Sequence, residues 1–219
     1  MPHALTELKL SEVTKPAEER ARDIHADVCV VGAGIAGLSA AIESARLGRE
    51  VVLVDSLPVI GGQMVHSLIG LFCGVFGNAP GYTQFTHAVF DDIFRDLGPG
   101  GDLHFQRGHT TTVYYNEVAL GRWMETTIRD LGIATMLASV LRGVDVRDGR
   151  VRSITLASRY GDVRVSASGF VDASGDAALT WEAGLPCWVP ERPIYGSQQV
   201  IVENVDENHK PDMGEMDAR

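Results

Sequence analysis

The chain has 219 residues, 45% hydrophobic and 22% charged, so it can bury the core of one large domain or of one domain with an insertion. A formal net charge of -10 without any basic cluster argues against a nucleic-acid partner. The three cysteines are scattered without CxxC or Cys/His spacing, so we predict neither a disulfide framework nor a metal site. The first twenty residues lack the apolar core of a signal peptide. The longest nearly apolar stretch, residues 28–42, is too short to span a membrane. We therefore expect a cytoplasmic protein.

The N-terminal part of the chain predicts a βαβ unit. Residues 1–25 are polar and are expected to form an arm outside the domain. The apolar run ADVCVV, residues 26–31, has the length of a buried parallel strand. Residues 35–47 have apolar side chains at helical spacing and are followed by Gly48, and residues 50–54 form a second apolar run. The crossover between the two strands should be right-handed.

The middle of the chain is less regular. Residues 57–85 are rich in glycine with apolar residues between, which predicts a loop with short helical turns. A helix is expected over residues 85–97, before the sequence GPGG. A second helix is expected over residues 117–131, with Asn116 as its N-cap and Gly132 at its end.

The last part of the domain is predicted to be β-rich. Residues 133–140 are strand-like, and the sequence RDGR is typical of a turn between strands at 140–146 and 151–157. A further strand over residues 163–171 leads into the sequence DASGD, residues 172–176. No internal repeat is visible.

The sequence GAGIAG, residues 32–37, has the GxGxxG spacing of a dinucleotide-binding loop. Its first glycine permits a tight turn, its second lets the backbone approach a pyrophosphate, and its third lets the helix lie close to the strand. The N-terminus of the helix offers N–H groups to the phosphates. Asp55, at the end of the second strand, is placed to bind a ribose hydroxyl and disfavours a 2′-phosphate. The alternative is a glycine-rich contact between helix and sheet without a ligand.

NAD and FAD share this fingerprint, so the choice between them depends on other residues. Gly61 and Gly62 follow Asp55 by six residues and would let the backbone pass close to the adenosine diphosphate part of FAD. The alternative is an ordinary turn.

A further pattern decides for FAD. The strand–hairpin–strand region is followed by FVDASGDAALTWEAG, residues 170–184. Together with GxGxxG, the acid and the glycine pair, this resembles the glutathione-reductase-type FAD-binding fold. It is most similar to the FAD-dependent oxidoreductase family over about residues 26–190. The resemblance implies an α/β, Rossmann-like FAD-binding domain with a parallel sheet, a β-hairpin crossover and a glycine-rich insertion at about residues 63–115. Within that insertion, GGQMVHSLIGLFCGVFG, residues 61–77, resembles the loop that runs under the flavin ring.

The resemblance also implies which residues bind FAD. The glycine loop would hold the pyrophosphate, the acid the adenosine ribose, and the backbone of Val140 the adenine. The implied positions are Gly32, Ala33, Gly34, Ile35, Ala36, Gly37, Asp55, Ser56, Gly61, Gly62, Gln63, Val140, Ala173, Ser174, Gly175 and Asp176. Two of them depart mildly from the family pattern: Ser174 stands where threonine is commoner, and Asp55 where glutamate is more frequent.

Flavin carries the hydride chemistry itself, so the chain does not need a catalytic side chain. His66 and Cys73 are weak candidates because they lie in the segment expected near the flavin. His66 is either a base, or a group that stabilises reduced flavin, or a structural hydrogen-bonding residue. Cys73 is either a point of covalent attachment to flavin or a buried apolar thiol.

Other polar and aromatic residues carry weaker expectations. Tyr114, Tyr115 and Arg122 are candidates for a substrate surface. Trp123 and Trp181 lie on helical patterns and are expected in the core.

Members of the resembled family usually continue into a substrate domain after the DASGD motif. We therefore expect a hetero-oligomer, in which a second polypeptide completes the FAD and substrate site and contacts residues 191–219. A fragment and a reduced FAD-binding protein are the alternatives. The predicted function is the FAD-binding subunit of an oxidoreductase that oxidises a C–N or C–O bond of a small molecule. An NAD-linked dehydrogenase and a non-catalytic FAD-binding or assembly subunit remain as alternatives.

Overall fold

The computed structural model describes residue 14, residues 22–192 and residue 196. The chain divides into two units, residues 1–188 and 189–219, and the elements below belong to the first. Most of the expected N-terminal arm and nearly all of the expected C-terminal extension lie outside the described residues.

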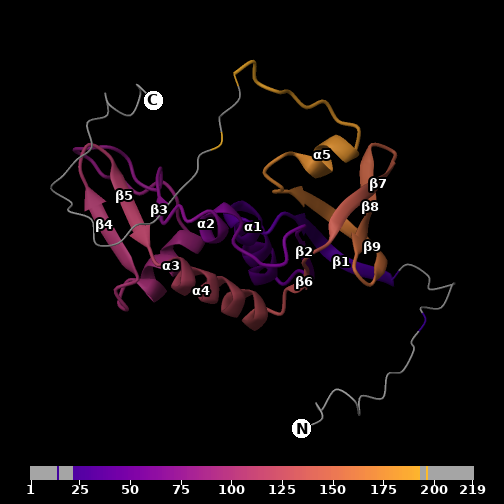
Figure 1. Ribbon diagram of the computed structural model, residues 1–219, viewed down its shortest axis with the longest axis horizontal. Helices are drawn as coiled ribbons and strands as arrows, with labels where there is room; N and C mark the ends of the chain where they lie inside the picture. The colour runs from indigo at the N-terminus through magenta and orange to yellow at the C-terminus, as the bar shows by residue number, and fades with distance from the viewer. Residues whose placement is uncertain (1–13, 15–21, 193–195, 197–219) are drawn as a thin grey trace, which may run out of the picture. The chain divides into compact units, whose positions relative to one another are not determined.

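The first unit contains a six-stranded sheet (Figure 1). Its strand order is β6-β2-β1-β9-β8-β7. The first four strands of that order are parallel, and β9, β8 and β7 follow as an antiparallel meander. The bounds are β1 Arg22–Val31, β2 Val51–Val54, β6 Ala134–Met136, β7 Val140–Arg147, β8 Arg150–Ser158 and β9 Gly161–Asp172. Strand β1 begins earlier than expected because Arg22 already pairs with Val163 of β9.

The predicted βαβ unit is confirmed. Helix α1 (Ile35–Arg46) connects β1 to its parallel neighbour β2. Its buried residues include Leu38, Ala41 and Ile42, which recur at helical spacing and face the sheet. Gly48 follows the helix with a φ of +75°, a conformation that glycine adopts at little cost.

The region between β2 and the next long helix holds a second, three-stranded antiparallel sheet with the order β3-β5-β4. Its strands are β3 (Leu71–Phe72), β4 (Leu103–Arg107) and β5 (Thr111–Tyr115), and the sequence did not predict β4 and β5. The short helix α2 (Gln63–His66) precedes this sheet, and α3 (Val89–Leu97) lies between β3 and β4 in the chain.

Helix α3 starts at Val89 and not at residue 85 as predicted. Ala88 has a φ of +59°, which lies outside the helical region and ends any helical run before it. The carboxylate of Asp91 accepts a hydrogen bond from the backbone N–H of Ala88 at 3.0 Å and so helps to close the first turn. Phe85 is left exposed.

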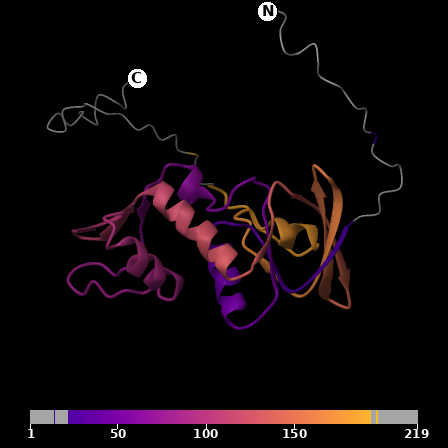
Figure 2. The ribbon, with the colours of Figure 1, turned by 90° about the horizontal axis from the view of Figure 1, so that it is seen from below.

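Helix α4 (Glu117–Asp130) has the predicted N-cap. The side-chain oxygen of Asn116 accepts hydrogen bonds from the backbone N–H groups of Val118 and Ala119, at 3.0 and 3.3 Å. Figure 2 shows how α4 leads from the three-stranded sheet to the larger sheet. Its buried residues, Leu120, Met124 and Ile128, form one stripe at spacings of four residues.

The strand predicted over residues 133–140 is interrupted. Strand β6 ends at Met136, and Ala138 has a φ of +50°. The backbone N–H of Ala138 donates to the carbonyl of Leu57 at 2.9 Å, and that of Ser139 to the carbonyl of Asp55 at 3.0 Å. This bend turns the chain away from the parallel strands and lets β7 begin next to the end of β2.

The six-stranded sheet carries a hydrophobic core on each face. Val30, Leu53, Leu38 and residues of α3 and α4 belong to one cluster. Cys29, Val52, the buried side of β8 and β9, and α5 (Ala178–Glu182) belong to the other. Because Cys29 is buried, the pKa of its thiol rises to about 12.

The two tryptophans expected in the core differ in burial. Trp123 is half-buried and packs against the first core cluster. Trp181 is 67% exposed, so its prediction as a core residue was wrong. Helix α5 has only five residues and buries only Leu179, which leaves Trp181 on its outer side.

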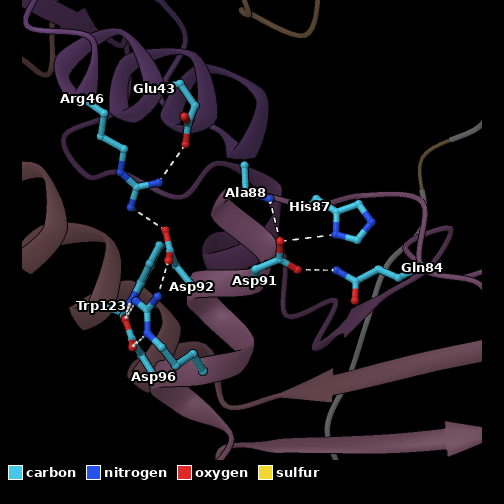
Figure 3. A network of polar contacts seen from close by, with 10 residues as sticks. Glu43, Arg46, Gln84, His87, Ala88, Asp91, Asp92, Asp96 and Trp123 are labelled. Atoms are coloured by element: carbon cyan, nitrogen blue, oxygen red, sulfur yellow. Dashed lines mark hydrogen bonds and ion pairs between the residues drawn. The ribbon is translucent and has the colours of Figure 1, made fainter.

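A polar network connects α1, α3 and α4 (Figure 3). Asp92 of α3 pairs with Arg46 of α1 and, at 2.5 Å, with Arg95 of its own helix. Asp96 pairs with Arg95 at 2.7 Å and accepts a hydrogen bond from the indole N–H of Trp123 at 2.9 Å. The interactions with Arg95 and then Trp123 lower the pKa of Asp96. The network connects α3, which belongs to the insertion, to α1 through Arg46 and to α4 through Trp123.

Candidate FAD site

Two glycines of the GxGxxG loop are required by close packing. Gly32 has a φ of +108°, and a Cβ at this position would lie 2.1 Å from the carbonyl oxygen of Ala173. A Cβ on Gly37 would lie 1.8 Å from the carbonyl oxygen of Gly32. These contacts join the end of β1, the start of α1 and the chain after β9 into one tight junction.

The middle glycine, Gly34, faces open space. A Cβ built on it meets no atom within 4 Å, and its φ of -73° is one that any residue adopts. Gly34 is the N-cap of α1, where none of the described residues provides a side-chain cap and where the first turn holds no acidic residue. The N-terminal N–H groups of this 12-residue helix are therefore directed at a site suited to an anion.

Asp55 is bound to the glycine loop by its own carboxylate. Its Oδ2 accepts a hydrogen bond from the backbone N–H of Ala33 at 2.6 Å, and its Oδ1 accepts one from Leu57 at 2.8 Å. An ionised carboxylate has about four acceptor positions, so Asp55 retains capacity for ribose hydroxyls.

A cavity of about 200 Å³ opens where β1, β2 and β9 end and β7 begins. It brings together five of the residues predicted to bind the cofactor, from four separate segments. This volume is below the roughly 300–1,000 Å³ of a complete ligand pocket, so it fits one end of a dinucleotide. The lining residues are Val31, Gly32, Val54, Asp55, Ser56, Ser139, Val140, Leu141, Ser174 and Ala178.

The glycine pair lies against the glycine loop and does not line this cavity. The backbone N–H of Gly61 donates to the carbonyl of Ala33 at 2.8 Å. A Cβ on Gly62 would lie 2.9 Å from the Cα of Gly34. Gln63 begins α2 and is exposed. The pair thus places α2 beside the open space at Gly34, while any contact of these three residues with a cofactor stays a prediction.

The DASGD segment is organised by Asp172, which is not among the predicted FAD-binding residues. The carboxylate of Asp172 accepts hydrogen bonds from the backbone N–H and hydroxyl of Ser174 and from those of Thr180. Burial would raise the pKa of Asp172, but these hydrogen bonds outweigh it and the pKa is lowered. An aspartate followed at positions +2 and +8 by hydroxyl residues is the signal that could have indicated this cluster. Gly175 and Asp176 are exposed.

The weak catalytic candidates lie in and after α2. Nε2 of His66 is 3.1 Å from the carbonyl oxygen of Ile60, which can only accept a hydrogen bond, so the structural role considered for His66 has a partner. Cys73 is exposed, and its interpretation as a buried thiol was wrong because it follows the two-residue strand β3 outside the core.

The three candidates for a substrate surface are not equivalent. The hydroxyl of Tyr115 donates to the carbonyl of Met64 at 2.9 Å. Burial and then the negative charge of Glu117 raise the pKa of Tyr115 to about 12. This tyrosine is 6% exposed and attaches α2 to the small sheet, whereas Tyr114 and Arg122 are exposed.

Taken together, the residues fit the adenosine diphosphate end of a dinucleotide. They supply an open glycine position at a helix N-terminus, an acid with free acceptor capacity and a cavity of nucleoside size.

The described part of the chain contains no helix that is both long and apolar enough to cross a membrane.

Comparison with known proteins identifies the class. The model of the family described as FAD dependent oxidoreductase matches residues 27–217. The chain belongs to this family, and its cofactor is FAD. The family assignment favours FAD over the NAD-linked alternative.

The curated relatives match only in part. The alpha chain of sarcosine oxidase from Corynebacterium sp. strain U-96 is 54% identical over 41 residues, 19% of this chain and 4% of that protein. Its counterpart from strain P-1 is 46% identical over 55 residues, 25% of this chain and 6% of that protein. Hydroxyneurosporene desaturase of Cereibacter sphaeroides is 40% identical over 84 residues, 38% of this chain and 16% of that protein. The matched segments thus span far less than two thirds of these relatives.

Solved structures share the fold at low sequence identity. Thermovibrio ammonificans THI4 has a TM-score of 0.53 and 18% identity, with 74% of this chain and 64% of that chain covered. The p-nitrophenol 4-monooxygenase PnpA of Pseudomonas putida has a TM-score of 0.54 and 14% identity, with 74% and 44% covered. These matches confirm the predicted α/β, Rossmann-like class of fold.

Proposed function

We propose that the chain is the FAD-binding part of an oxidoreductase that oxidises a C–N or C–O bond of a small organic substrate, with transfer to FAD of a hydride from the carbon of that bond. The observation that carries the proposal is the cavity between Gly32, Asp55 and Val140, together with the open space at Gly34. FAD, when bound, supplies the hydride-accepting chemistry. The chain binds and orients its adenosine diphosphate end.

Each part of the site has a separate task in this proposal. The N-terminal N–H groups of α1 bind the pyrophosphate above Gly34. The carboxylate of Asp55 accepts hydrogen bonds from the adenosine ribose while it holds Ala33. The backbone at Val140, which the bend at Ala138 brings to the cavity, contacts the adenine.

We further propose that a second polypeptide completes the flavin and substrate side. Among the described residues, those that fit FAD would contact its adenosine diphosphate end. The segment expected beneath the flavin, residues 61–77, leaves His66, Leu68 and Cys73 exposed. The two sarcosine oxidase relatives support a multi-chain enzyme, because each is named as one subunit of its enzyme.

An amine or amino-acid substrate is the first choice within the proposed class. Sarcosine is an N-methyl amino acid, so the name sarcosine oxidase fits oxidation of a C–N bond in those two relatives. Hydroxy acids represent the C–O alternative. No side chain is assigned as a catalytic residue, and His66 stays the candidate for a base.

The test is co-expression of the chain with the neighbouring open reading frames, followed by purification with FAD. Amines, amino acids and hydroxy acids are then added separately without oxygen, and the flavin absorbance is recorded. We expect a second polypeptide to co-purify and one substrate class to bleach the flavin. The Gly34→Ala variant is the matched control, because it should fold but bind FAD more weakly.

Three outcomes would contradict parts of the proposal. Stable binding of NAD in place of a flavin would restore the NAD-linked alternative. A bound flavin that no substrate reduces, with the partner present, would favour a non-catalytic FAD-binding subunit. Full flavin loading and full turnover by the chain alone would refute the need for a second polypeptide.

A further inference from the structure

Asp172 lies at the junction between the last strand of the sheet and the helix that follows it. It is the final residue of β9, whose neighbour β1 leads directly into the glycine loop. Its Oδ1 accepts from the backbone N–H of Ser174 at 3.1 Å and from the Ser174 hydroxyl at 2.7 Å. Its Oδ2 accepts from the backbone N–H of Thr180 at 2.8 Å and from the Thr180 hydroxyl at 2.7 Å. One carboxylate therefore fixes two further points of the chain, the second of them eight residues after Asp172 itself.

The segment held by this carboxylate forms part of the cavity wall. The backbone N–H of Ala173 donates to the carbonyl of Val31 at 2.7 Å, and the carbonyl of Ala173 is the atom that a side chain on Gly32 would strike. The hydroxyl of Ser174 also accepts from the backbone N–H of Ala178 at 2.8 Å. Ser174 and Ala178 line the same cavity as Gly32.

The geometry of the cluster depends on a carboxylate at position 172. Four donors converge on two oxygens, and hydrogen bonds to an ionised acceptor are about twice as strong as neutral ones. Both donors of Ser174, its backbone N–H and its hydroxyl, bind Asp172, so Ser174 has no free donor for a ligand and contributes mainly through its position. An amide in place of the carboxylate would turn its NH₂ group towards N–H donors of Ser174 or Thr180 and leave them unpaired.

We propose that Asp172 is a positioning residue for FAD: through Ser174 and Thr180 it holds residues 173–178 in the geometry that shapes the adenosine end of the cofactor site. The inference rests on the proposed function, because it assumes that the cavity receives FAD. It adds two residues, Asp172 and Thr180, to those that determine cofactor affinity, although neither lines the cavity.

The test measures FAD affinity and folding separately in the full chain. The dissociation constant is obtained by titrating the apoprotein into FAD and following flavin fluorescence. Urea unfolding of the same apoprotein gives its stability. We expect Asp172→Asn to weaken FAD binding by about tenfold or more, and Thr180→Val by about threefold or more. Thr180→Ser keeps the hydroxyl and should retain wild-type affinity.

The outcomes separate positioning from simple stabilisation. If Asp172→Asn unfolds at lower urea but its folded form binds FAD with wild-type affinity, the positioning role is wrong. If Asp172→Asn does not fold, the pair Thr180→Val and Thr180→Ser decides, and equal FAD affinities in this pair would overturn the inference. Failure of the wild-type chain to bind FAD even with its co-purified partner present would overturn the proposed function together with this inference. Binding without reduction by any substrate would contradict only the proposed oxidoreductase activity.

Discussion

Two alanine substitutions, at the middle and the last glycine of the GxGxxG motif, allow the effects on FAD binding and on folding to be separated. At Gly34 the added methyl group meets no atom within 4 Å, and its φ of -73° suits alanine. Alanine is a poorer N-cap than glycine, but it also restricts the unfolded chain, and the two effects are each about 0.5–1 kcal/mol and opposite in sign. We therefore expect Gly34→Ala to change the free energy of unfolding of the apoprotein by less than about 1 kcal/mol.

The same methyl group should strongly affect FAD binding. It would occupy the space at the helix N-terminus where we place the pyrophosphate. Inserting a methyl group into a well-packed contact costs about 1–3 kcal/mol, which corresponds to a loss of affinity of about 5- to 150-fold. At Gly37, by contrast, the methyl group would lie 1.8 Å from a backbone carbonyl oxygen. Gly37→Ala should therefore destabilise the fold itself by about 3 kcal/mol or more.

The assay combines urea unfolding of each apoprotein with titration of FAD against flavin fluorescence. The expected pattern is normal unfolding with weak binding for Gly34→Ala, and early unfolding for Gly37→Ala. If Gly34→Ala bound FAD as tightly as the wild type, the pyrophosphate would not lie above Gly34 and the assignment of the site would be wrong. If both variants unfolded alike, the distinction between an open and a packed glycine would fail.

Three further predictions concern stability and reactivity. Asp92→Ala removes the ion pair with Arg46 and should lower the free energy of unfolding by about 2 kcal/mol. The control Asp130→Ala, at an exposed ion pair, should change it by less than about 0.5 kcal/mol. The urea midpoints of the two variants measure the difference. A thiol reagent should modify the exposed Cys73 and Cys187 of the native chain and reach Cys29 only after unfolding. Mass spectrometry detects the modified residues. Modification of Cys29 in the native chain as fast as that of the exposed cysteines would contradict its burial. The lowered pKa of Asp172 stabilises the fold above the unfolded value near pH 4, and this contribution is lost as pH falls through the folded pKa. The urea midpoint should thus fall from about pH 5 to about pH 3, and fall less in Asp172→Asn; an equal fall in both would refute the assignment.

Local sequence signals were sufficient where a residue has one strong conformational or capping role. Gly48 marks the end of α1, and Asn116 caps α4. Gly32 and Gly34 lie between β1 and α1, and Gly37 lies in the first turn of α1, as the motif predicts. Asp55 at the end of β2 also lies where the motif places it, next to Gly32 in the same cavity. Gly48 and Asn116 act through their own backbone or their nearest neighbours, and the fixed spacing of the motif places the glycines and Asp55, so the sequence predicts all of them.

Elements that depend on distant partners were not predictable in this way. Strand β4 has four exposed residues in a row and no alternation, and it is a strand only because it pairs with β5. The break between β6 and β7 depends on hydrogen bonds from Ala138 and Ser139 to residues 55–57, which lie far away in sequence. The helix α5 is likewise too short for its sequence pattern to show which side packs on the core, so the exposure of Trp181 was not predicted.

The two carboxylates of the site act first on the protein itself. Asp55 holds the backbone of Ala33 in the glycine loop, and Asp172 holds the segment that Gly32 contacts. Two of the four segments that line the cavity are therefore fixed by hydrogen bonds from these carboxylates. A site ordered in advance loses less conformational entropy when its ligand binds, so more of the contact energy appears as affinity. Because both donors of Ser174 bind Asp172, the contribution of this segment to FAD affinity depends on how accurately its backbone is placed. Cofactor binding should consequently be sensitive to residues such as Thr180 that never touch the cofactor.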